Sequence, residues 1–366
     1  MIDRSLSFKP GRNVLKRCRA LSFVILALIT CSLFTSCPKP SSSSSPSPGP
    51  KSPWTWIDRS GATGNRNWDS IASSSEGTKL AAVAMGGGVY TSENSGGTWT
   101  NRAEGDNADS DIAGDKNWKS IASSSDGSKL AAVVSVWGIY ISADYGATWT
   151  HRLAASGRYW RSIASSSDGS KLVAVGDYGL IYTSADYGAT WIDRSRANGN
   201  RNGWRSIASS SDGRNLAAVV ENGGLYTSGN SGETWKNRSE GNDADPDITG
   251  DKLWISIASS SDGRRLAAVA WGWGGGIYTS ADYGATWTHQ TAAGDRDWNA
   301  IASSSDGRRL AAVAFRGGVY TSDDFGETWT HHTVAESRTW WHIASSSDGE
   351  KLAVVSGGGV YTGVFQ

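Results

Sequence analysis

Cysteine is almost missing from this 366-residue chain. The only three cysteines, Cys18, Cys31 and Cys37, lie within the first 37 residues. The rest of the chain can therefore form no disulfide, even in an oxidising compartment, and must be stabilised by packing and hydrogen bonds. A domain of roughly 310 residues is long enough to bury a sufficient core without cross-links.

Proline is equally scarce once the first fifty or so residues are passed. Pro246 is the only proline after Pro53, so a β-sheet built from this part of the chain is not interrupted by proline. The chain also lacks a nucleophile–base constellation, a phosphate-binding loop and a cofactor motif. The sequence therefore gives no indication of an enzyme that uses an activated nucleophile, a nucleotide or a cofactor.

What the chain has in abundance is internal repetition. The segment I-A-S-S-S occurs seven times, beginning at Ile71, Ile121, Ile163, Ile207, Ile257, Ile301 and Ile343. Each copy extends into W-x-S-I-A-S-S-S-D-G-x-K/R-L-A-A-V, followed by a glycine-rich bend and Y-T-S. Short β-rich runs between Asp-Gly and Gly turns indicate antiparallel strands joined by hairpins.

Each repeat predicts four strands, which we place at W-x-S-I-A, L-A-A-V-A, G-x-Y-T-S and T-W-T-x-R and call strands a to d. Four strands in about 45 residues are typical of a β-propeller blade. The seventh repeat ends after its third strand, whereas residues 54–59 match the strand-d text of residues 190–194. We therefore predict an all-β, seven-bladed propeller over residues 54–366, closed by residues 54–59 as the last strand of the last blade.

The octad SADYGATW stands at residues 142–149, 184–191 and 280–287, and close variants begin at Ser92, Ser228 and Ser322. The pattern Ser-x-Asp-x-Gly-x-Thr-Trp resembles the Asp-box, or BNR repeat, of sialidases, sortilin-type receptors, certain xyloglucanases and photosystem II assembly factors. That resemblance implies a turn between strands c and d, in which Ser and Asp oxygens bind turn N–H groups. The Asp position is filled by Asp144, Asp186, Asp282, Asp324, Asn94 and Asn230.

The resemblance covers residues 54–366 and implies a fold rather than an activity. Sialidase-type relatives need an Arg-Ile-Pro motif, which this chain lacks, and their propellers have six blades. We expect a non-catalytic binding or assembly module whose ligand is a glycan or a protein. The alternative is a glycoside hydrolase, sialidase-like or polysaccharide-cleaving, with an acid pair that the sequence does not identify.

The first 36 residues are typical of a lipoprotein-type signal peptide. Six basic residues precede an apolar stretch over residues 20–36, which is too short for a spanning helix. The sequence Phe34-Thr35-Ser36-Cys37 resembles a bacterial lipobox, with Phe34 in the place of the usual Leu, and implies a lipid-anchored Cys37 on an extracytoplasmic membrane surface. Ordinary cleavage and secretion is the alternative.

Residues 37–53 form a Ser/Pro-rich segment, which we interpret as an extended tether. The whole chain has 35 basic and 35 acidic residues, and six basic residues and one acidic residue precede Cys37. The remainder therefore has 29 basic and 34 acidic residues, a net charge of −5. Such a domain, without a basic stripe, is not expected to bind nucleic acid, and we expect it to be monomeric.

Residues that break the repeat are candidates for function. Side chains in the b–c bends, or next to a strand-a Trp, include Trp137, Tyr178, Trp271, Trp273, Phe315, Arg316 and Trp341. Aromatic rings on one rim of a propeller are suited to stacking on sugars or holding a peptide. The alternative interpretation is that they pack against neighbouring blades.

Two d–a connections are longer than the others and acidic. Aligned on each other, they offer Asn107, Asp109, Asp111 and Asp115 in one and Asp243, Asp245, Asp247 and Asp251 in the other. Several oxygens in a tight turn suit calcium, although neither the glycine nor the closing glutamate of an EF-hand is present. A solvated acidic loop is the alternative. We predict no other cofactor.

Overall fold

The computed structural model describes residues 53–103, 111–152, 157–195, 203–240, 246–250, 252–272, 275–334 and 338–366. The chain divides into two compact units, Met1–Pro50 and Lys51–Gln366, and all described residues belong to the second. The predicted signal peptide, Cys37 and nearly all of the tether lie outside the described residues. Within the described part, no helix has the length and apolar character needed to cross a membrane.

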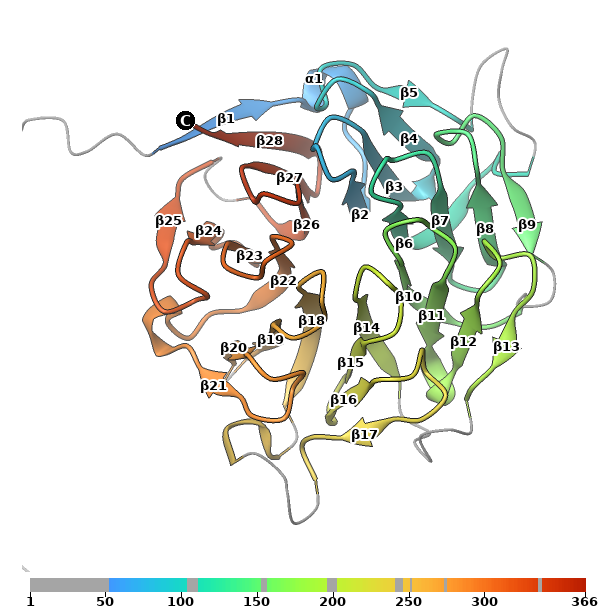
Figure 1. The fold of residues 1–366 in the computed structure, drawn as a ribbon. Coiled ribbons are helices and arrows are strands. Elements are labelled where there is room, and N and C mark those ends of the chain that lie inside the picture. The colour runs from blue at the N-terminus through green and yellow to red at the C-terminus, as the bar shows by residue number, and fades with distance from the viewer. Residues whose placement is uncertain are drawn as a thin grey trace, which may run out of the picture. The chain divides into compact units, whose positions relative to one another are not determined.

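Seven four-stranded antiparallel blades form a circle within the described residues (Figure 1). The first three consist of β2 (Trp68–Ser73), β3 (Leu80–Gly87), β4 (Val89–Ser92) and β5 (Thr100–Asn101); β6 (Lys116–Ser123), β7 (Leu130–Val134), β8 (Gly138–Ser142) and β9 (Thr150–Arg152); and β10 (Trp160–Ser165), β11 (Leu172–Gly176), β12 (Ile181–Ser184) and β13 (Ile192–Asp193). A short pairing between the end of β3 and the start of β6 joins the first two blades.

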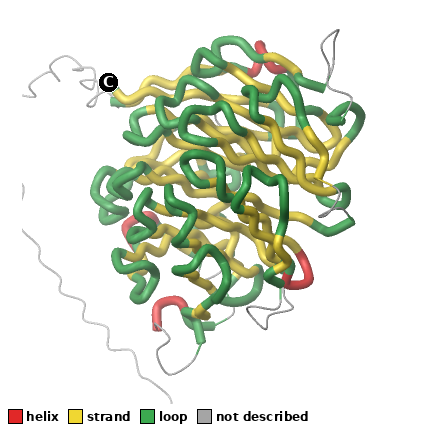
Figure 2. Tube along the Cα trace, turned by 45° about the vertical axis from the view of Figure 1, so that its right-hand side comes forward, coloured by secondary structure: helices red, strands yellow, loops and turns green. Residues whose placement is uncertain are grey.

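The other four blades repeat this arrangement. They consist of β14 (Trp204–Ser209), β15 (Leu216–Val220), β16 (Leu225–Ser228) and β17 (Lys236–Asn237); β18 (Leu253–Ser259), β19 (Leu266–Trp271), β20 (Gly276–Ser280) and β21 (Thr288–His289); β22 (Trp298–Ser303), β23 (Leu310–Ala314), β24 (Gly318–Ser322) and β25 (Thr330–His332); and β26 (Trp340–Ser345), β27 (Lys351–Ser356), β28 (Gly359–Phe365) and β1 (Trp54–Asp58). Helix α1 (Ser60–Thr63) and 3₁₀ turns at Asp177–Gly179, Pro246–Ile248 and Thr291–Ala293 lie in connections. Figure 2 shows loops at both ends of the strands.

The predicted closure of the ring is confirmed. Strand β1 pairs antiparallel with β28, with Trp54 opposite Phe365 and Asp58 opposite Tyr361. The backbone N–H of Arg59 continues the pairing by donating to Val360 O at 2.8 Å. The last blade is therefore built from both ends of the propeller sequence, which leaves β28 covered rather than exposed as an edge.

A second ring of hydrogen bonds shows that the circle has seven members. At each a–b turn a serine donates its backbone N–H to the carbonyl of the corresponding serine in the next blade, at 2.7–2.8 Å. The series runs through Ser75, Ser125, Ser167, Ser211, Ser261, Ser305 and Ser347 and returns to Ser75. Each turn thereby fills a backbone donor and an acceptor that its own hairpin leaves unpaired.

The core lies between neighbouring sheets, as seven clusters of buried side chains. The tryptophan that opens each strand a is at most 1 % exposed; the set is Trp68, Trp118, Trp160, Trp204, Trp254, Trp298 and Trp340. Each packs against the strand-c tyrosine of its own blade with ring centroids 5.0–5.4 Å apart. Aromatic burial on this scale can stabilise the ring without disulfides.

The octads form six equivalent turns between strands c and d. In the second blade Ser142 Oγ accepts the N–H of Gly146 at 2.9 Å, and Asp144 accepts the N–H and the hydroxyl of Thr148 at 2.8 and 2.6 Å. Gly146 has a φ of 82°, which favours glycine. Asn94 accepts the corresponding N–H of Thr98 at 2.8 Å, so the amide can replace the carboxylate.

One detail of the strand assignment is wrong. Except for Trp56 in β1, the tryptophan of the T-W-T-x-R segment precedes strand d instead of lying in it. In five of the six octads its indole N–H donates to the carbonyl of the octad glycine at 2.9–3.1 Å. That bond keeps the tryptophan in the turn, and strand d starts at the residue after it.

Candidate functional site

A single position of the repeat lines the centre of the ring. The residue that follows each strand-a tryptophan borders one cavity of ≈ 170 Å³. We call this set the channel mouth, and its members are Asp69, Lys119, Arg161, Arg205, Ile255, Asn299 and Trp341. Because all seven blades contribute one residue each, the cavity lies on the axis of the propeller. The charge and polarity of the channel mouth therefore depend on this position, which is the most variable one in strand a.

Two of the three cations at the channel mouth are paired with carboxylates. Lys119 Nζ lies 3.0 Å from Asp69 Oδ2. The Arg161 guanidinium donates two hydrogen bonds to the Asp177 carboxylate, at 3.0 and 2.9 Å. These bonds raise the pKa of Arg161 above its usual value. Asp177 belongs to a b–c bend, so this pair ties the bend to the channel mouth.

Arg205 is the third cation, and it comes from the blade next to that of Arg161. It is half-buried and has no hydrogen-bond or ion-pair partner among the described residues. Three consecutive blades therefore contribute positive charge to the opening, and only two of these charges are offset by a carboxylate in contact. This side of the channel mouth is suited to an anionic group, because guanidinium binds carboxylates through planar paired hydrogen bonds.

Below the channel mouth, side chains link each blade to the next. In five blades a serine Oγ accepts the backbone N–H of the following blade's isoleucine at 3.3 Å; these are Ser70, Ser120, Ser162, Ser206 and Ser256. In the last blade His342 takes this role, because its Nδ1 accepts from Ile71. Burial lowers the pKa of His342 to about 4, so the imidazole is neutral near pH 7 and a weak base.

Ala300 in the sixth blade cannot accept such a bond. There the Asn299 side chain donates Nδ2–H to Trp340 O at 2.7 Å and joins the sixth blade to the seventh. His342 and Asn299 therefore have structural contacts that explain their presence at the centre without a catalytic role.

Four of the candidate residues from the b–c bends and strand a lie together. The ring of Trp271 is 5.0 Å from that of Phe315, and Phe315 is 5.9 Å from Trp341. The guanidinium of Arg316 lies over Phe315 at 5.2 Å. We call Trp271, Phe315 and Trp341 the aromatic strip. It crosses three blades and ends at the channel mouth, where the Trp341 side chain is 40 % exposed.

The remaining aromatic candidates are not part of the strip. Trp137 is 60 % exposed and packs near Lys116 Nζ, 5.4 Å from the ring centroid. Tyr178 is 75 % exposed and meets Tyr159 edge to face at 6.1 Å. Trp273 lies outside the described residues. The candidate aromatic residues therefore do not form one shared surface. Three of them form the aromatic strip, and Trp137 and Tyr178 lie apart from it.

The acidic connections are described only in part. Asn107, Asp109, Asp243, Asp245 and Asp251 lie outside the described residues. Asp111 accepts the backbone N–H of His151 at 3.4 Å, and Asp247 that of His289 at 3.3 Å, while Asp115 is exposed. Within the described residues, no group of three or more His, Cys, Asp or Glu side chains could hold a metal.

A structural feature of these connections was not predicted. Each inserts one isoleucine, Ile112 or Ile248, that is fully buried against the tryptophans of neighbouring strands. The two isoleucines and the two aspartates that bind strand-d backbone give both connections a packing role.

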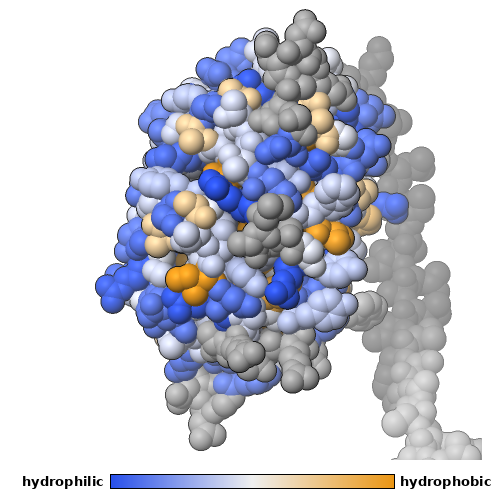
Figure 3. Space-filling model, turned by 90° about the vertical axis from the view of Figure 1, so that its right-hand side faces the viewer, coloured by the Kyte–Doolittle hydropathy of each residue, from blue (hydrophilic) through white to orange (hydrophobic). Residues whose placement is uncertain are grey.

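The side of the propeller seen in Figure 3 is largely hydrophilic, with apolar side chains scattered over it. Isolated exposed apolar residues are normal for a soluble domain. Sequence reasoning missed Lys119, Arg161 and Arg205, which a comparison of the one variable position within W-x-S-I-A would have singled out.

No family model matches the sequence, and no curated protein matches it. Many solved structures share the fold, and three of them illustrate the range. YCF48 bound to D1 peptide has a TM-score of 0.63 and 15% identity, covering 86% of this chain and 97% of that one. The GH74 xyloglucanase from Xanthomonas campestris has a TM-score of 0.60 and 15% identity, and the match covers 84% of this chain and 53% of that one. The Cps50 (Swd1) β-propeller domain from Myceliophteria thermophila has a TM-score of 0.60 and 13% identity, and the match covers 82% of this chain and 97% of that one. At these identities the likeness establishes a β-propeller.

Proposed function

We propose that this propeller is a non-catalytic binding module that holds an extended segment of a partner protein across its channel mouth. The observation that carries the proposal is the aromatic strip, which leads from the fifth blade to Trp341 at the opening. Flat aromatic faces anchor apolar side chains, and the opposite side of the opening presents Arg205 and two paired cations. A segment that carries both apolar and acidic residues fits this surface.

The structural neighbours support binding as the general role. One of them, YCF48, was solved with a D1 peptide bound, and the Swd1 propeller belongs to the same fold. A glycan is the second candidate ligand, because the exposed rings of Trp341 and Tyr178 could equally stack on sugar rings.

A hydrolase is less well supported, although a GH74 xyloglucanase shares the fold. Glycoside hydrolysis requires one protonated and one ionised carboxyl group on either side of the bond. Asp69 and Asp177, which lie near the opening, are each bound to a cation. Both groups therefore have a role as ion-pair partners that requires no catalytic function.

We further propose that the module is displayed on an extracytoplasmic membrane surface through a lipid on Cys37. The basis is the sequence of the leader and of the Ser/Pro-rich tether. Two acyl chains or more are needed for stable anchoring, which a modified N-terminal cysteine would supply. Metabolic labelling with a fatty acid should mark the wild type and not Cys37→Ser, and the variant should leave the membrane fraction. A labelled Cys37→Ser protein would contradict the anchor.

The test of the binding function uses the propeller with a random peptide array and a glycan array as probes. We expect acidic peptides with apolar residues to bind, and Trp341→Ala or Arg205→Glu to reduce binding at least about tenfold. Tyr187→Ala, on the face that carries the octad turns, is the matched control and should bind as the wild type does. Exclusive binding to the glycan array would favour the second candidate. Hydrolysis of a polysaccharide that Asp69→Asn abolishes would overturn the proposal.

A further inference from the structure

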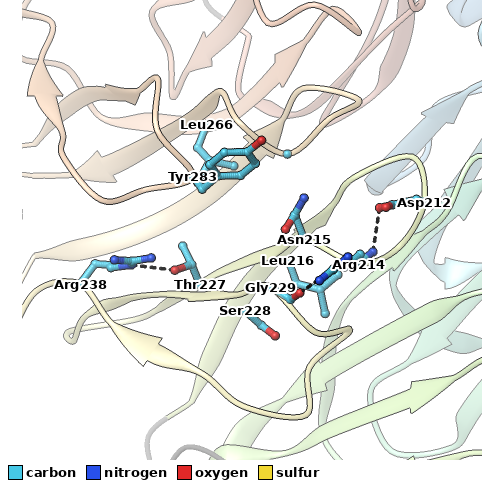
Figure 4. A pocket seen from close by; sticks show the side chains of 11 residues that line it. Asp212, Arg214, Asn215, Leu216, Thr227, Ser228, Gly229, Arg238, Leu266 and Tyr283 are labelled. Carbon is cyan, nitrogen blue, oxygen red and sulfur yellow. Dashed lines mark hydrogen bonds between the residues drawn. The ribbon is translucent and has the colours of Figure 1, made fainter.

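A polar groove opens between the fourth and fifth blades, on the face that carries the octad turns. It has a volume of ≈ 490 Å³ and is bordered by Arg214, Asn215, Gly229, Arg238 and Tyr283, with hydroxyl groups beside them. Figure 4 shows Tyr283 on one side, from the fifth blade, and the other four on the fourth blade. We call it the Tyr283 groove.

The other blade boundaries show what normally fills this place. A lysine or arginine at the start of strand b lies over the aromatic residue of the next blade's octad: Lys79 over Tyr145 at 3.6 Å, Lys129 over Tyr187 at 4.3 Å and Arg265 over Phe325 at 3.6 Å. The cavity that remains beside the covered ring is ≈ 10 Å³ at the Lys79–Tyr145 boundary and ≈ 350 Å³ at the Arg265–Phe325 boundary.

At the Tyr283 groove the repeat is altered in two places. Asn215 occupies the position of the lysine or arginine, and its short amide reaches only to Asp262 O, at 3.0 Å. Gly229 has no side chain where the other octads have Ala, Glu or Asp. No described cation covers the ring of Tyr283, which is 47 % exposed. The face of the Tyr283 ring is therefore open at this boundary, whereas a cation covers the equivalent ring at three others.

Arg238 brings a positive charge into the groove. Its Nε donates to Thr227 Oγ1 at 2.7 Å, and its Nη groups have no partner among the described residues. At the preceding boundary the equivalent Arg194 is paired with Glu233 at 3.5 Å, but the residue equivalent to Glu233 in the fifth blade is Ala285. Burial lowers the pKa of Arg238, which reflects the cost of keeping this charge half-buried.

A second guanidinium stands at the rim. Arg214 Nε donates to Gly229 O at 3.0 Å, and the rest of its side chain is exposed. The groove thus combines two guanidinium groups, an amide and an open aromatic face. The Asp212 carboxylate also borders it, and the Asp282 carboxylate attracts Arg238. Guanidinium recognises carboxylate, sulfate and phosphate groups, and an aromatic face stacks on a flat ring or on the apolar side of a sugar.

We propose that the Tyr283 groove is a second binding site, which takes a small anion carried on a ring. The anionic group binds Arg238, with Arg214 beside it, and the ring stacks on Tyr283. This site lies on the face opposite the channel mouth and does not depend on the binding function proposed above. An acidic sugar and an aromatic acid share this chemistry, so both serve as probes.

The experiment titrates the propeller with glucuronate, phenyl phosphate and inorganic phosphate by calorimetry. We expect one or both ring-bearing anions to bind more tightly than inorganic phosphate, and to bind more weakly as salt is added. Glucuronate binding indicates a sugar ligand, and phenyl phosphate binding an aromatic one. Equal affinity for all three probes would show that Tyr283 contributes nothing and would overturn the proposal, as would binding by none.

Two variants locate the site, and the first has a control inside the same ring. Arg238→Gln should weaken binding at least about tenfold. Arg102→Gln removes an equivalent bond, from Nε to Thr91 Oγ1 at 2.7 Å, and should match it in stability without affecting binding. Asn215→Lys should place an ammonium group over the ring of Tyr283, as Lys79 does over Tyr145, and should weaken binding of the ring-bearing anions while the protein remains folded. Unchanged affinity in Arg238→Gln or Asn215→Lys would contradict the site, and Trp341→Ala should leave it intact.

Discussion

His342 Nδ1 accepts the backbone N–H of Ile71 at 3.5 Å, across the boundary between the last blade and the first. Every other such bond in the described ring is accepted by a serine hydroxyl. The histidine is the one titratable member of the set, and it stands beside the place where the ring closes. It therefore makes closure of the propeller sensitive to acid.

We predict that stability falls between pH 6.5 and pH 4 because of this residue. Burial lowers the pKa of His342 from 6.5 to about 4, so in this window the unfolded chain binds a proton that the folded one excludes. The free energy of unfolding therefore decreases as the pH falls, by up to about 2 kcal/mol at pH 5 from this group. His342→Ser, which introduces the residue that five other blades have at this position, should remove that part of the loss.

The measurement is urea denaturation of wild type and His342→Ser at pH 7.5 and pH 5. Some loss should remain in the variant, because burial also lowers the pKa of His332 to about 4. An identical decrease in both proteins would show that His342 does not couple stability to pH.

Removing strand β1 should open the ring. Deleting the chain up to residue 59 exposes β28 and the partners of Trp54 and Trp56, and we expect a loss of at least about 3 kcal/mol. The exposed edge should also promote self-association. Thermal denaturation and light scattering measure both effects, and a deletion up to residue 52 is the control. If the two truncated proteins melt together and stay monomeric, β1 does not close the propeller in solution.

The octad turn should tolerate an amide but not the loss of its acceptor. Asp144→Asn keeps an oxygen for the N–H of Thr148, as Asn94 does for Thr98, and should change stability by less than about 0.5 kcal/mol. Asp144→Ala leaves the turn N–H without that acceptor and should cost about 1–3 kcal/mol. Chemical denaturation of both variants tests the pair. Equal losses would show that the carboxylate has a role beyond the turn.

The calcium hypothesis for the acidic connections makes a separate prediction. A cation that binds the folded state raises the melting temperature with its concentration. The wild type should then melt higher in calcium than in chelator, and Asp243→Asn combined with Asp247→Asn should abolish the difference. The bond from His289 N–H to Asp247 is an internal reference, because its loss lowers stability in both conditions. Equal melting of the wild type with and without chelator excludes the site.

The architecture could be predicted from the sequence because each blade repeats the same local pattern. Seven copies of the Trp-opened strand, and the match of residues 54–59 to a strand d, were enough to predict the number of blades and their closure. Trp341 was identified as a candidate because it follows a strand-a tryptophan, and the structure places it at the channel mouth. The strand-d boundaries failed because the indole hydrogen bond to the octad glycine cannot be read from strand patterns.

The sites were harder to predict, because they depend on which blades are neighbours. The three cations of the channel mouth, Lys119, Arg161 and Arg205, are separated by 42 and 44 residues in the sequence. They can be recognised as one site only because the ring brings them to the same opening. Asn215 is an ordinary polar residue in the sequence. It becomes informative when the structure shows that lysine or arginine covers the next aromatic ring at comparable boundaries.

The seam in the last blade has a practical consequence for engineering. Gln366 donates its backbone N–H to Pro53 O at 2.7 Å, so the two residues can be joined by a short linker without moving either strand. New termini could then be introduced at an a–b hairpin turn of a blade that lies across the ring from the last blade. Such circular permutants would carry the same blades with an uninterrupted last sheet, and would allow a fusion partner to be attached at any chosen sector.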